Sequence, residues 1–543
     1  MPGFNLSSVF DAVANAVPDQ EVMVWRERRV TYREVNERAT AIASWFAGRG
    51  LGARQPRAEL AGHESGHDHV ALYLYNGNEY LESWIGAFRA RLGAVNVNYR
   101  YVDEELIYLL RDSQAKAVVY HAEFAPRIAA IRDQLPELVH LVQVADDSDN
   151  PLLPGAVAYE NVLATPAAVL PEPDGEDPFL IYTGGTTGMP KGVIWTHHDI
   201  FVSAMGGTPY GSTEPYADLD AIAKAAVDAN GGLALLMIAP LMHGAAQWGA
   251  FHFMVSGGKL VVPDNVRAFE PHACIRVAVE EKVFNIPVVG DAIARPLVEV
   301  MESGEFDLST LGSISNGGAP MSPAIRHRLL AAAPHLFITD AVGSSESGIQ
   351  MSQMSTAGAE AESAVFTPNA DTVVLDEGLA RQLEPGEGIG WLARRGRIPL
   401  GYLGDAEKTA RTFPEVLGSR WVVAGDRAEL LADGRIKLLG REGVTINSGG
   451  EKIFAEEVEM ALAAHPAIKD VVVVGRPSEK WGSEVVAIVV VEGEVTDEEL
   501  LAEAGTHVAR YKLPKAIVRR DALLRSAAGK ADYRWAKEQA VKP

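Results

Sequence analysis

The stretch Ile181-Tyr-Thr-Gly-Gly-Thr-Thr-Gly-Met-Pro-Lys191-Gly-Val193 joins an apolar run to a loop of small residues. The run Phe179-Leu-Ile-Tyr182 predicts a buried strand, and the glycines after it let the backbone bend and approach a ligand closely. Threonine hydroxyls and the ammonium group of Lys191 are donors that suit phosphate oxygens. Two residues separate Gly188 from Lys191, so the loop is not a Walker A motif. A phosphate-binding loop of another type and an ordinary surface turn are the alternatives.

The composition describes a globular chain with several structural units. At 543 residues the chain exceeds what one hydrophobic core serves, so roughly two to four units are expected. A net charge of −23 disfavours nucleic-acid binding, because phosphate backbones attract basic surfaces. Cys274 is the one cysteine, which excludes intrachain disulfides and multi-cysteine metal sites. The residues Met1–Ser7 lack the basic and apolar regions of a signal peptide, so we expect a cytoplasmic protein.

One uncharged segment is a candidate for crossing a membrane. Residues 231–258 contain no Asp, Glu, Lys or Arg and are long enough to span a bilayer. The segment also contains Pro240, two histidines and several glycines. We therefore expect a buried strand, a turn and a helix, and no transmembrane segment.

Short apolar runs alternate with helical patterns along most of the chain. The predicted elements of the first part are a hairpin over 22–32, strands over 70–75, 94–97, 117–120 and 141–144, and helices over 34–48, 79–92, 104–112 and 124–134. A second series has strands over 233–238, 259–262, 283–286 and 312–315 and a helix over 244–255, and a smaller unit has strands over 470–474 and 485–491 and a helix over 497–509. This alternation predicts parallel α/β layers. Residues 146–174 are typical of a linker, and residues 201–230 fit no predicted element.

Three histidines, His63, His67 and His69, fall in a polar loop over residues 54–69. Their spacing permits a metal site, but no partner ligands are near them in the sequence. We expect these side chains to be exposed to solvent.

Two glycine-rich turns carry further candidate residues. The stretch Ser315–Ser322 contains Gly317 and Gly318, which let a planar base or acyl chain lie against the backbone. The stretch Thr339–Gly348 contains Glu346 after small hydroxyl residues, and its carboxylate suits Mg²⁺. The alternatives are a plain strand-to-helix turn and a surface glutamate.

Three charged residues lie further along the chain. Asp426 ends the apolar run Trp421-Val-Val-Ala-Gly and can accept hydrogen bonds from two ribose hydroxyls, or it caps a turn. Arg441 offers a planar fork for ribose or phosphate oxygens, or it is an exposed arginine. Lys530 follows Gly529 near the C-terminus, where a solvated lysine is the alternative.

In this order the stretches resemble the signatures of the adenylate-forming superfamily, from Val30 to Lys530. That superfamily comprises acyl-CoA synthetases, peptide-synthetase adenylation domains and firefly-type luciferases. Within it, the chain looks most like actinobacterial acyl-CoA synthetases that act on long-chain or steroid side-chain acids. The motifs that carry this similarity are Asn98-Tyr-Arg-Tyr101 with Glu104-Glu-Leu106, Tyr182-Thr-Gly-Gly-Thr-Thr-Gly188 and Asn447-Ser-Gly-Gly-Glu-Lys-Ile-Phe454.

The resemblance implies an α/β fold with two domains. Residues 1–440 would form a large N-terminal domain of layered α/β subdomains, and residues 441–543 a small mobile α+β C-terminal domain. It also implies ATP and Mg²⁺ as cofactors, coenzyme A as co-substrate, a small-molecule carboxylic acid as substrate, and a homodimer.

The resemblance further implies roles for individual residues. The ATP phosphates would be held by Thr183, Gly184, Gly185, Thr186, Thr187, Gly188 and Lys191. Adenine would contact Gly317, Gly318, Ala319 and Asp340, with Ser345 also in the nucleotide site. Mg²⁺ would be held by Glu346 and Thr186, ribose by Asp426 and Arg441, and the pantetheine arm of CoA would pass Gly449 and Gly450. Lys530 would reach the substrate carboxylate and the α-phosphate, and His243 and Trp248 would line the acyl side.

Two positions depart from the family pattern. Val342 stands where the family usually has an aromatic residue that stacks on adenine, so stacking must be weaker or come from elsewhere. Gly443 stands where the interdomain hinge is commonly Asp or Lys. Glycine absorbs large changes in φ and ψ, so rotation is expected to survive with a less tightly defined hinge.

The expected function is therefore ATP-dependent acyl-CoA synthesis on a hydrophobic acid. The apolar segment 231–258 favours such an acid over acetate. The alternatives are an adenylation enzyme that loads a carrier protein, a luciferase-like oxidase, and an inactive sensor of acyl nucleotides. The acidic balance disfavours a nucleic-acid ligase.

Overall fold

The computed structural model describes residues 3–183, 189–209, 211–448, 451–478, 481–526 and 529–541, without the side chains of 451 and 452. The chain divides into two compact units. The first comprises Met1–Ile286 with Arg397–Arg411, and the second comprises Pro287–Gly396 with Thr412–Pro543. The predicted domain boundary after residue 440 is a different division and stays a prediction.

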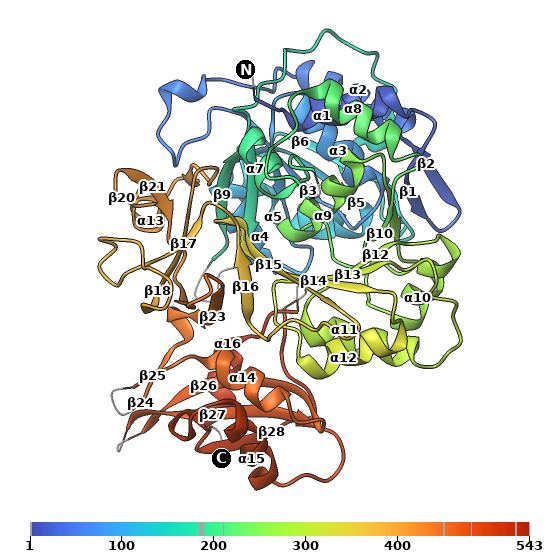
Figure 1. The fold of residues 1–543 in the computed structure, drawn as a ribbon. Helices are drawn as coiled ribbons and strands as arrows, with labels where there is room; N and C mark the ends of the chain where they lie inside the picture. Colours follow the sequence, from blue (N-terminus) through green and yellow to red (C-terminus); the bar gives the residue numbers. More distant parts are fainter. Residues whose placement is uncertain are drawn as a thin grey trace. The chain divides into compact units, whose positions relative to one another are not determined.

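The first unit contains a parallel five-stranded sheet in the order β4-β3-β5-β6-β7. Figure 1 labels three of its strands, β3, β5 and β6. Its strands are β3 (His69–Tyr73), β4 (Gly93–Asn96), β5 (Ala115–His121), β6 (His140–Val144) and β7 (Val157–Ala158). The helices among them are α3 (Asn78–Arg89), α4 (Asp103–Asp112), α5 (Ala125–Ile131) and α6 (Tyr159–Leu163). Every residue of β3 is buried, as expected for a strand covered on both faces. The predicted alternation of strands and helices is confirmed here, and part of the expected linker forms β7 and α6.

A second group of strands in this unit has the order β2-β1-β11-β10-β12. These are β1 (Glu21–Trp25), β2 (Arg28–Thr31), β10 (Ala234–Leu236), β11 (Lys259–Val262) and β12 (Asn285–Val288). The helices of the same part are α1 (Leu6–Ala16), α2 (Tyr32–Ala47), α7 (His197–Ala204), α8 (Leu219–Asp228), α9 (Gly244–Val255) and α10 (Pro271–Glu280). Thr31 and Glu34 form a capping box that fixes the start of α2. The charge-free segment forms β10 and α9, and no helix in the described ranges is long and apolar enough to cross a membrane.

The single cysteine lies on α10. Cys274 is buried, and burial raises the pKa of its thiol to about 12. The thiol is therefore protonated at any physiological pH.

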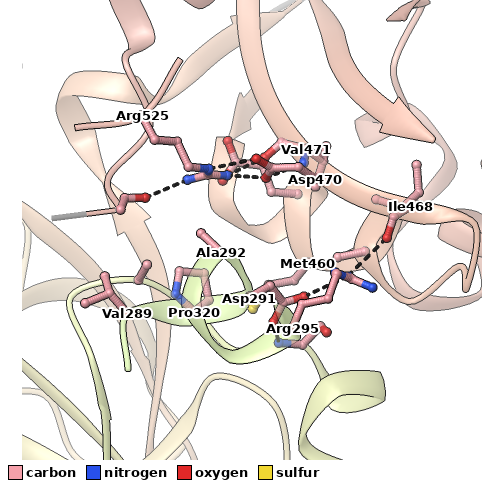
Figure 2. Close-up of a pocket in the computed structure, with 15 residues that line it drawn as sticks. Val289, Asp291, Ala292, Arg295, Pro320, Met460, Ile468, Asp470, Val471 and Arg525 are labelled. Carbon is pink, nitrogen blue, oxygen red and sulfur yellow. Dashed lines mark hydrogen bonds and ion pairs between the residues drawn. The ribbon is translucent and has the colours of Figure 1, made fainter. Parts of the chain in front are cut away.

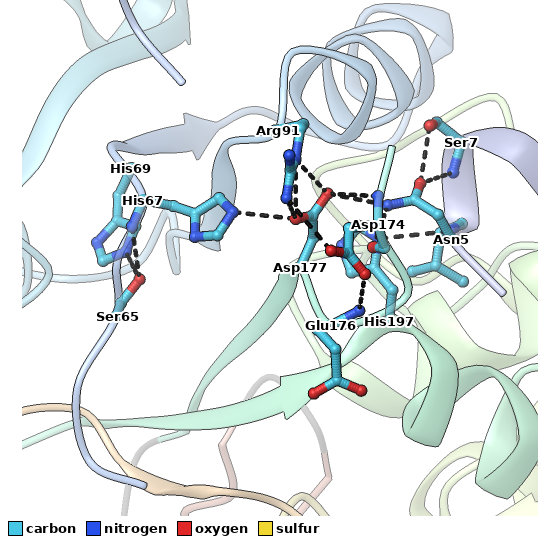
Figure 3. Close-up of polar contacts among 11 residues, drawn as sticks. Asn5, Ser7, Ser65, His67, His69, Arg91, Asp174, Glu176, Asp177 and His197 are labelled. Carbon is cyan, nitrogen blue, oxygen red and sulfur yellow. Dashed lines mark hydrogen bonds and ion pairs between the residues drawn. The ribbon is translucent and has the colours of Figure 1, made fainter. Parts of the chain in front are cut away.

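The histidine loop is part of a buried polar network (Figure 3). His67 Nε2 donates to Asp177 Oδ1 at 3.0 Å, and His69 Nε2 lies 2.7 Å from Ser65 Oγ. His69 is 4% exposed, and burial lowers its pKa to about 4. The expected solvent exposure of His67 and His69 is wrong, because Asp177 and Ser65 supply polar partners in the interior. Among the described residues, no group of three His, Cys, Asp or Glu side chains could hold a metal ion.

The candidate phosphate loop, between Thr183 and Lys191, connects two strands of a small antiparallel sheet in the order β19-β9-β8. The strands are β8 (Pro178–Thr183), β9 (Lys191–Thr196) and β19 (Gly401–Tyr402), and α13 (Ala406–Thr412) follows β19 in the chain. The apolar run over residues 179–182 is therefore a buried strand, as predicted.

The second unit contains a mixed sheet in the order β13-β14-β15-β16-β23-β22-β18-β21-β20, with β17 paired to β18. Its strands are β13 (Ser313–Gly317), β14 (Phe337–Ser344), β15 (Gly348–Thr356), β16 (Val365–Pro368), β17 (Thr372–Leu375), β18 (Gly388–Arg395), β20 (Glu415–Val416), β21 (Ser419–Val422), β22 (Asp426–Leu430) and β23 (Ile436–Arg441). Two helices, α11 (Gly290–Met301) and α12 (Pro323–Ala332), precede β13 and β14 in the chain.

The same unit ends in a small α+β part. Its strands are β24 (Ile446–Ser448), β25 (Glu451–Ile453), β26 (Ile468–Ser478), β27 (Gly482–Val491) and β28 (Ala516–Arg519), and its helices are α14 (Ala455–Ala463), α15 (Asp497–His507) and α16 (Tyr533–Val541). The strands β26, β27 and β28 form one sheet, with β26 antiparallel and β28 parallel to β27. The predicted fold class, layered α/β with a smaller α+β part at the C-terminal end, is confirmed.

Candidate functional site

The β8–β9 hairpin holds both described ends of the candidate phosphate loop. Thr183 stands opposite Lys191 in the antiparallel register. Lys191 Nζ lies 3.6 Å from Asp405 Oδ2. Desolvation opposes its charge, but the Tyr108 hydroxyl, Asp112 and Asp405 together raise the pKa of Lys191. Lys191 is therefore protonated at neutral pH. It is the first residue of β9, at the C-terminal end of the candidate phosphate loop. The other predicted loop residues, Gly184, Gly185, Thr186, Thr187 and Gly188, lie outside the described residues.

Two asparagines that the sequence analysis missed fix the segment before His243. Asn96 donates from Nδ2 to the carbonyl of Tyr182 at 2.9 Å and to that of Met242, and it accepts from the Tyr182 amide at 2.8 Å. Asn76 donates to the carbonyls of Met237 and Ala239, both at 3.1 Å. The two side chains thus tie the ends of β3 and β4 to β8 and to the turn after β10.

The predicted acyl-side residues lie at the start of α9. His243 is the N-cap residue of α9. Trp248 is buried, and its indole nitrogen has no hydrogen-bond partner among the described residues. Gly244 packs against β8, because a Cβ on it would lie 3.3 Å from the Ile181 side chain. The candidate acyl-side residues therefore neighbour the strand that leads into the phosphate loop.

In the second unit, the glycine turn after β13 is held by buried polar side chains. Asn316 accepts from the Gly290 amide at 2.8 Å and donates to Asp340 Oδ1 at 2.8 Å and to the Ala319 carbonyl at 3.1 Å. Gly318 has φ +82°, and among the described residues a Cβ on Gly317 would meet only the Ala341 carbonyl oxygen, at 3.5 Å. The turn therefore leaves open space above Gly317, as a bound planar group would need.

Asp340 is 4% exposed and its oxygens are already paired. Besides Asn316, it accepts from Arg326 Nη2 at 2.9 Å and from Gln353 Nε2 at 3.2 Å. These contacts assign Asp340 a role in holding β13, β14 and β15 together. Its contact with adenine stays a prediction.

Four predicted residues come together as a charged cluster in the second unit. Asp426 begins β22 and stands opposite Arg441 at the end of β23, and Arg441 Nε donates to Asp426 Oδ1 at 3.2 Å. The carboxylates of Asp426 and Glu346 raise the pKa of Arg441. Desolvation and the charge of Arg441 lower the pKa of Lys530, while Glu346 and Asp426 oppose this shift. The charges of Asp426 and Glu346 thus act on both Arg441 and Lys530. Ser345 and Glu346 occupy the turn between β14 and β15.

Glu456 joins this cluster, although the sequence analysis did not single it out. It lies in the first turn of α14, and its Oε1 accepts from the Arg441 amide at 3.5 Å. It also packs on Gly440, where a Cβ would lie 2.2 Å from Glu456 Oε2. Burial raises its pKa to about 7. An acidic first turn is a common helix start and carried no signal of this contact.

Each unit, taken by itself, offers side chains whose donor chemistry suits ATP or Mg²⁺. Glu346 offers carboxylate oxygens of the kind that Mg²⁺ prefers, and Asp426 offers acceptors for ribose hydroxyls. Lys191 and Lys530 are cations for phosphate and carboxylate oxygens. The predicted second Mg²⁺ ligand, Thr186, and the predicted pantetheine residues, Gly449 and Gly450, lie outside the described residues.

The structure shows the surroundings of Val342 and Gly443, the two residues that depart from the family pattern. Val342 is partly buried against the cluster of Met351, Phe366 and Val374 in the mixed sheet. Gly443 lies in a 3₁₀ turn, Glu442–Val444, and no atom of the described residues lies within 4 Å of where its Cβ would be.

Comparison with protein families covers most of the chain. Residues 10–403 match the family model described as AMP-binding enzyme, and residues 457–530 match the AMP-binding enzyme C-terminal domain. A Mycobacterium avium protein named medium-chain acyl-CoA ligase Mig is 51% identical, over 99% of this chain and 98% of that protein. A Rhodococcus rhodochrous protein named 3-oxocholest-4-en-26-oate–CoA ligase is 37% identical, over 98% of this chain and 96% of that protein.

Two solved structures share the fold over nearly the whole chain. The anthranilate CoA ligase AuaEII in complex with anthranoyl-AMP has a TM-score of 0.82 at 21% identity, covering 99% of this chain and 98% of that chain. A Mycobacterium tuberculosis fatty acyl CoA synthetase has a TM-score of 0.68 at 25% identity, covering 98% of both chains.

Proposed function

Because the chain belongs to the AMP-binding enzyme family, we propose that it is an ATP-dependent acyl-CoA synthetase for a hydrophobic carboxylic acid. The observation that carries this proposal is the cluster of Glu346, Asp426, Arg441 and Lys530. A protein that only bound an acyl nucleotide would need no lysine in the electrostatic field of Glu346 and Asp426, where it can reach a reacting carboxylate.

The reaction has two steps. In the first, a substrate carboxylate attacks the α-phosphorus of ATP, an acyl–phosphate bond forms and pyrophosphate leaves. In the second, the thiol of CoA attacks the acyl carbonyl, a thioester forms, AMP leaves and the thiol proton passes to solvent. No general base is needed in the first step, because a carboxylate is ionised at neutral pH.

The protein's task in the first step is to hold two anions together. Lys191 binds phosphate oxygens at the hairpin, and Lys530 bridges the carboxylate and the α-phosphate. Asp426 and Arg441 orient the ribose. Mg²⁺ held by Glu346 and Thr186 would neutralise phosphate charge.

The acid we propose is a medium- or long-chain alkyl acid or a steroid side-chain acid. Two relatives carry names for such substrates, and the charge-free segment that forms β10 and α9 supplies an apolar wall in this chain. The proposal places the enzyme in the cytoplasm, where its one thiol stays reduced. The homodimer stays a prediction.

The test is CoA-dependent AMP formation with ATP and Mg²⁺ across acetate, octanoate, palmitate and a steroid side-chain carboxylate. We expect turnover on a hydrophobic acid and little on acetate. Acid-dependent pyrophosphate exchange with no CoA consumption, together with loading of a holo-carrier protein, would instead identify a carrier-protein adenylation enzyme. Light emission or oxygen uptake would identify a luciferase-like oxidase, and no exchange with any acid would favour an inactive sensor.

A further inference from the structure

Lys530 is hydrogen-bonded through its backbone to Ser526, and the described residues Ser526, Gly529 and Lys530 belong to one turn. The Ser526 amide donates to the Lys530 carbonyl at 2.8 Å, and the Lys530 amide donates to Ser526 Oγ at 3.2 Å. The Gly529 amide donates to the Ser526 carbonyl at 2.9 Å. The backbone around Lys530 is thus fixed by hydrogen bonds at both ends of the turn.

Gly529 lets this turn approach α11 closely. Its φ is +71°, and a Cβ on it would lie 3.1 Å from Val289 Cγ1 and 3.3 Å from the Val289 carbonyl oxygen. A side chain would be strained by conformation and crowded by the backbone. One side of the turn therefore packs closely against Val289, the residue before α11.

Arg525 holds the other face with a planar fork (Figure 2). Its Nε donates to Asp470 Oδ2 at 2.9 Å, its Nη1 donates to the Gly529 carbonyl at 3.0 Å, and its Nη2 also reaches the Val471 carbonyl at 3.3 Å. The side chains of Arg525 and Asp470 are 22% and 27% exposed, so the pair is partly shielded from water. One guanidinium thus links β26 to the carbonyl of the residue directly before Lys530.

We propose that Arg525 and Asp470 form a clamp that positions Lys530 for acyl-adenylate formation, an inference that rests on the proposed acyl-CoA synthetase function. Lysine is a flexible side chain, and its ammonium group must meet both the carboxylate and the α-phosphate. The fork fixes the backbone from which that side chain extends, and Arg525 itself contacts no substrate. A lysine at position 525 would keep the charge but lose the planar geometry that reaches three acceptors.

The chain offers a matched control on the same sheet. Arg476 on β26 donates from Nε and Nη2 to Glu484 Oε1 at 2.8 and 2.7 Å, and from Nη1 to the Ala540 carbonyl at 3.1 Å. The guanidinium group of Arg476 thus also joins one carboxylate to one backbone carbonyl, as that of Arg525 does. Arg476→Ala therefore removes a comparable contact without touching the turn that carries Lys530.

The first measurement separates the two half-reactions in Arg525→Ala, Arg525→Lys, Asp470→Asn, Arg476→Ala and Lys530→Ala. Pyrophosphate exchange reports adenylation, and conversion of supplied octanoyl-AMP and CoA to octanoyl-CoA reports the second step. We expect Arg525→Ala to lower kcat for exchange by on the order of a hundredfold, as small misplacements of catalytic groups do. The KM for ATP, and the second step, should change by no more than about twofold. Lys530→Ala should show the same selectivity, and Arg476→Ala should retain both steps.

The second measurement needs no substrate. Hydrogen exchange in the ligand-free protein follows the amides of Gly529 and Lys530, which are hydrogen-bonded in the turn. Arg525→Ala should speed their exchange, whereas Arg476→Ala should not. Arg525→Lys should restore neither the slow exchange nor adenylation.

Two results for Arg525→Ala would each contradict the proposed clamp. One is unchanged hydrogen exchange of the Gly529 and Lys530 amides. The other is an equal loss of both half-reactions together with a lowered Tm. If the wild-type protein shows no pyrophosphate exchange with any acid, the proposed function fails. In that event the amide exchange still decides whether Arg525 holds the turn.

Discussion

At the scale of single residues, Glu459 is a carboxyl group that stays protonated at neutral pH. Burial, and then the nearby carboxylate of Glu456, raise its pKa to about 8. It accepts from the Val473 amide at 2.8 Å and from the Tyr533 hydroxyl at 3.3 Å. An uncharged acid can keep these contacts without the cost of burying a charge.

We predict that Glu459→Gln stabilises the protein at alkaline pH. The folded-state pKa lies above that of the unfolded chain, so the native state binds more protons between about pH 4.5 and 8. Stability is therefore lost as the pH rises through this window, and glutamine removes the loss. At pH 8.5 the variant should gain roughly 2 kcal/mol in free energy of unfolding, with little change at pH 5. Urea unfolding at both pH values measures this, with exposed Glu498→Gln as control, and an equal effect at both would contradict it.

Charged residues of the candidate site could be placed from the sequence because their order along the chain carries a signature. Glu346, Asp426, Arg441 and Lys530 do meet in one cluster. Glu456 was missed, because its contact with the Arg441 amide depends on how α14 packs against β23. Asn96 was missed for the same reason. Its partner Tyr182 is far away in the sequence, so the residues around Asn96 do not indicate the contact.

At the scale of elements, Asp177 joins the start of β8 to three other segments. Arg91 Nη2 donates to Asp177 Oδ1 at 2.7 Å, and His67 and Asn5 Nδ2 also donate to this carboxylate. Burial works against the charge, but His67 and Arg91 hold the pKa of Asp177 at about 2. The carboxylate is 2% exposed, and the Asp174 amide also donates to it at 3.2 Å, so its charge is balanced inside the protein.

We predict that Asp177→Asn destabilises the fold by about 3 kcal/mol at pH 7, because it leaves Arg91 without its buried partner. The contribution of Asp177 is present above the pKa of an unfolded aspartate and is lost as the pH falls towards 2. Asp174→Asn is the control, since Asp174 is 55% exposed and lies 3.8 Å from Arg91. Urea unfolding of both variants is the measurement. Equal small losses would mean that the buried pair contributes little.

Most elements could be predicted because strands and helices have distinct apolar periods. The helix α8, within the unassigned stretch 201–230, had a signal that was not used, since Asp218 accepts from the Ala221 amide as an N-cap. The burial of His67 and His69 had no such local signal. His67 contacts Asp177, which is far away in the sequence, and His69 contacts Ser65 and the carbonyl of Ser113.

At the scale of the whole molecule, the resemblance implies that the small C-terminal part rotates between the two steps of the proposed reaction. Gly443 is the candidate pivot, and among the described residues no atom lies within 4 Å of where its Cβ would be. We predict that Gly443→Pro slows conversion of acyl-AMP to acyl-CoA by about tenfold, because proline fixes φ. Pyrophosphate exchange should persist.

The matched control for this pivot is Gly443→Ala, which restricts φ less than proline does and whose methyl group would meet no described atom within 4 Å. Stopped-flow measurement of the two half-reactions compares the variants. Identical behaviour of the proline and alanine variants, or parallel loss of both steps, would exclude Gly443 as the pivot.

The superfamily predicted from the sequence is confirmed, because the family models and close relatives cover nearly the whole chain. The acid could not be read from the sequence, since apolar walls of similar composition fit alkyl and steroid groups alike. The domain boundary after residue 440 and the roles of the loop residues stay predictions.

The single buried thiol on α10 has a practical consequence. A protonated, inaccessible sulfur does not react with maleimides or with Ellman's reagent. Free coenzyme A can therefore be titrated colorimetrically in the presence of the native enzyme. One engineered surface cysteine on each side of Gly443 in the chain would give two labelling positions for a donor–acceptor dye pair, without deletion of Cys274. Changes in energy transfer during turnover would then report the reorganisation directly.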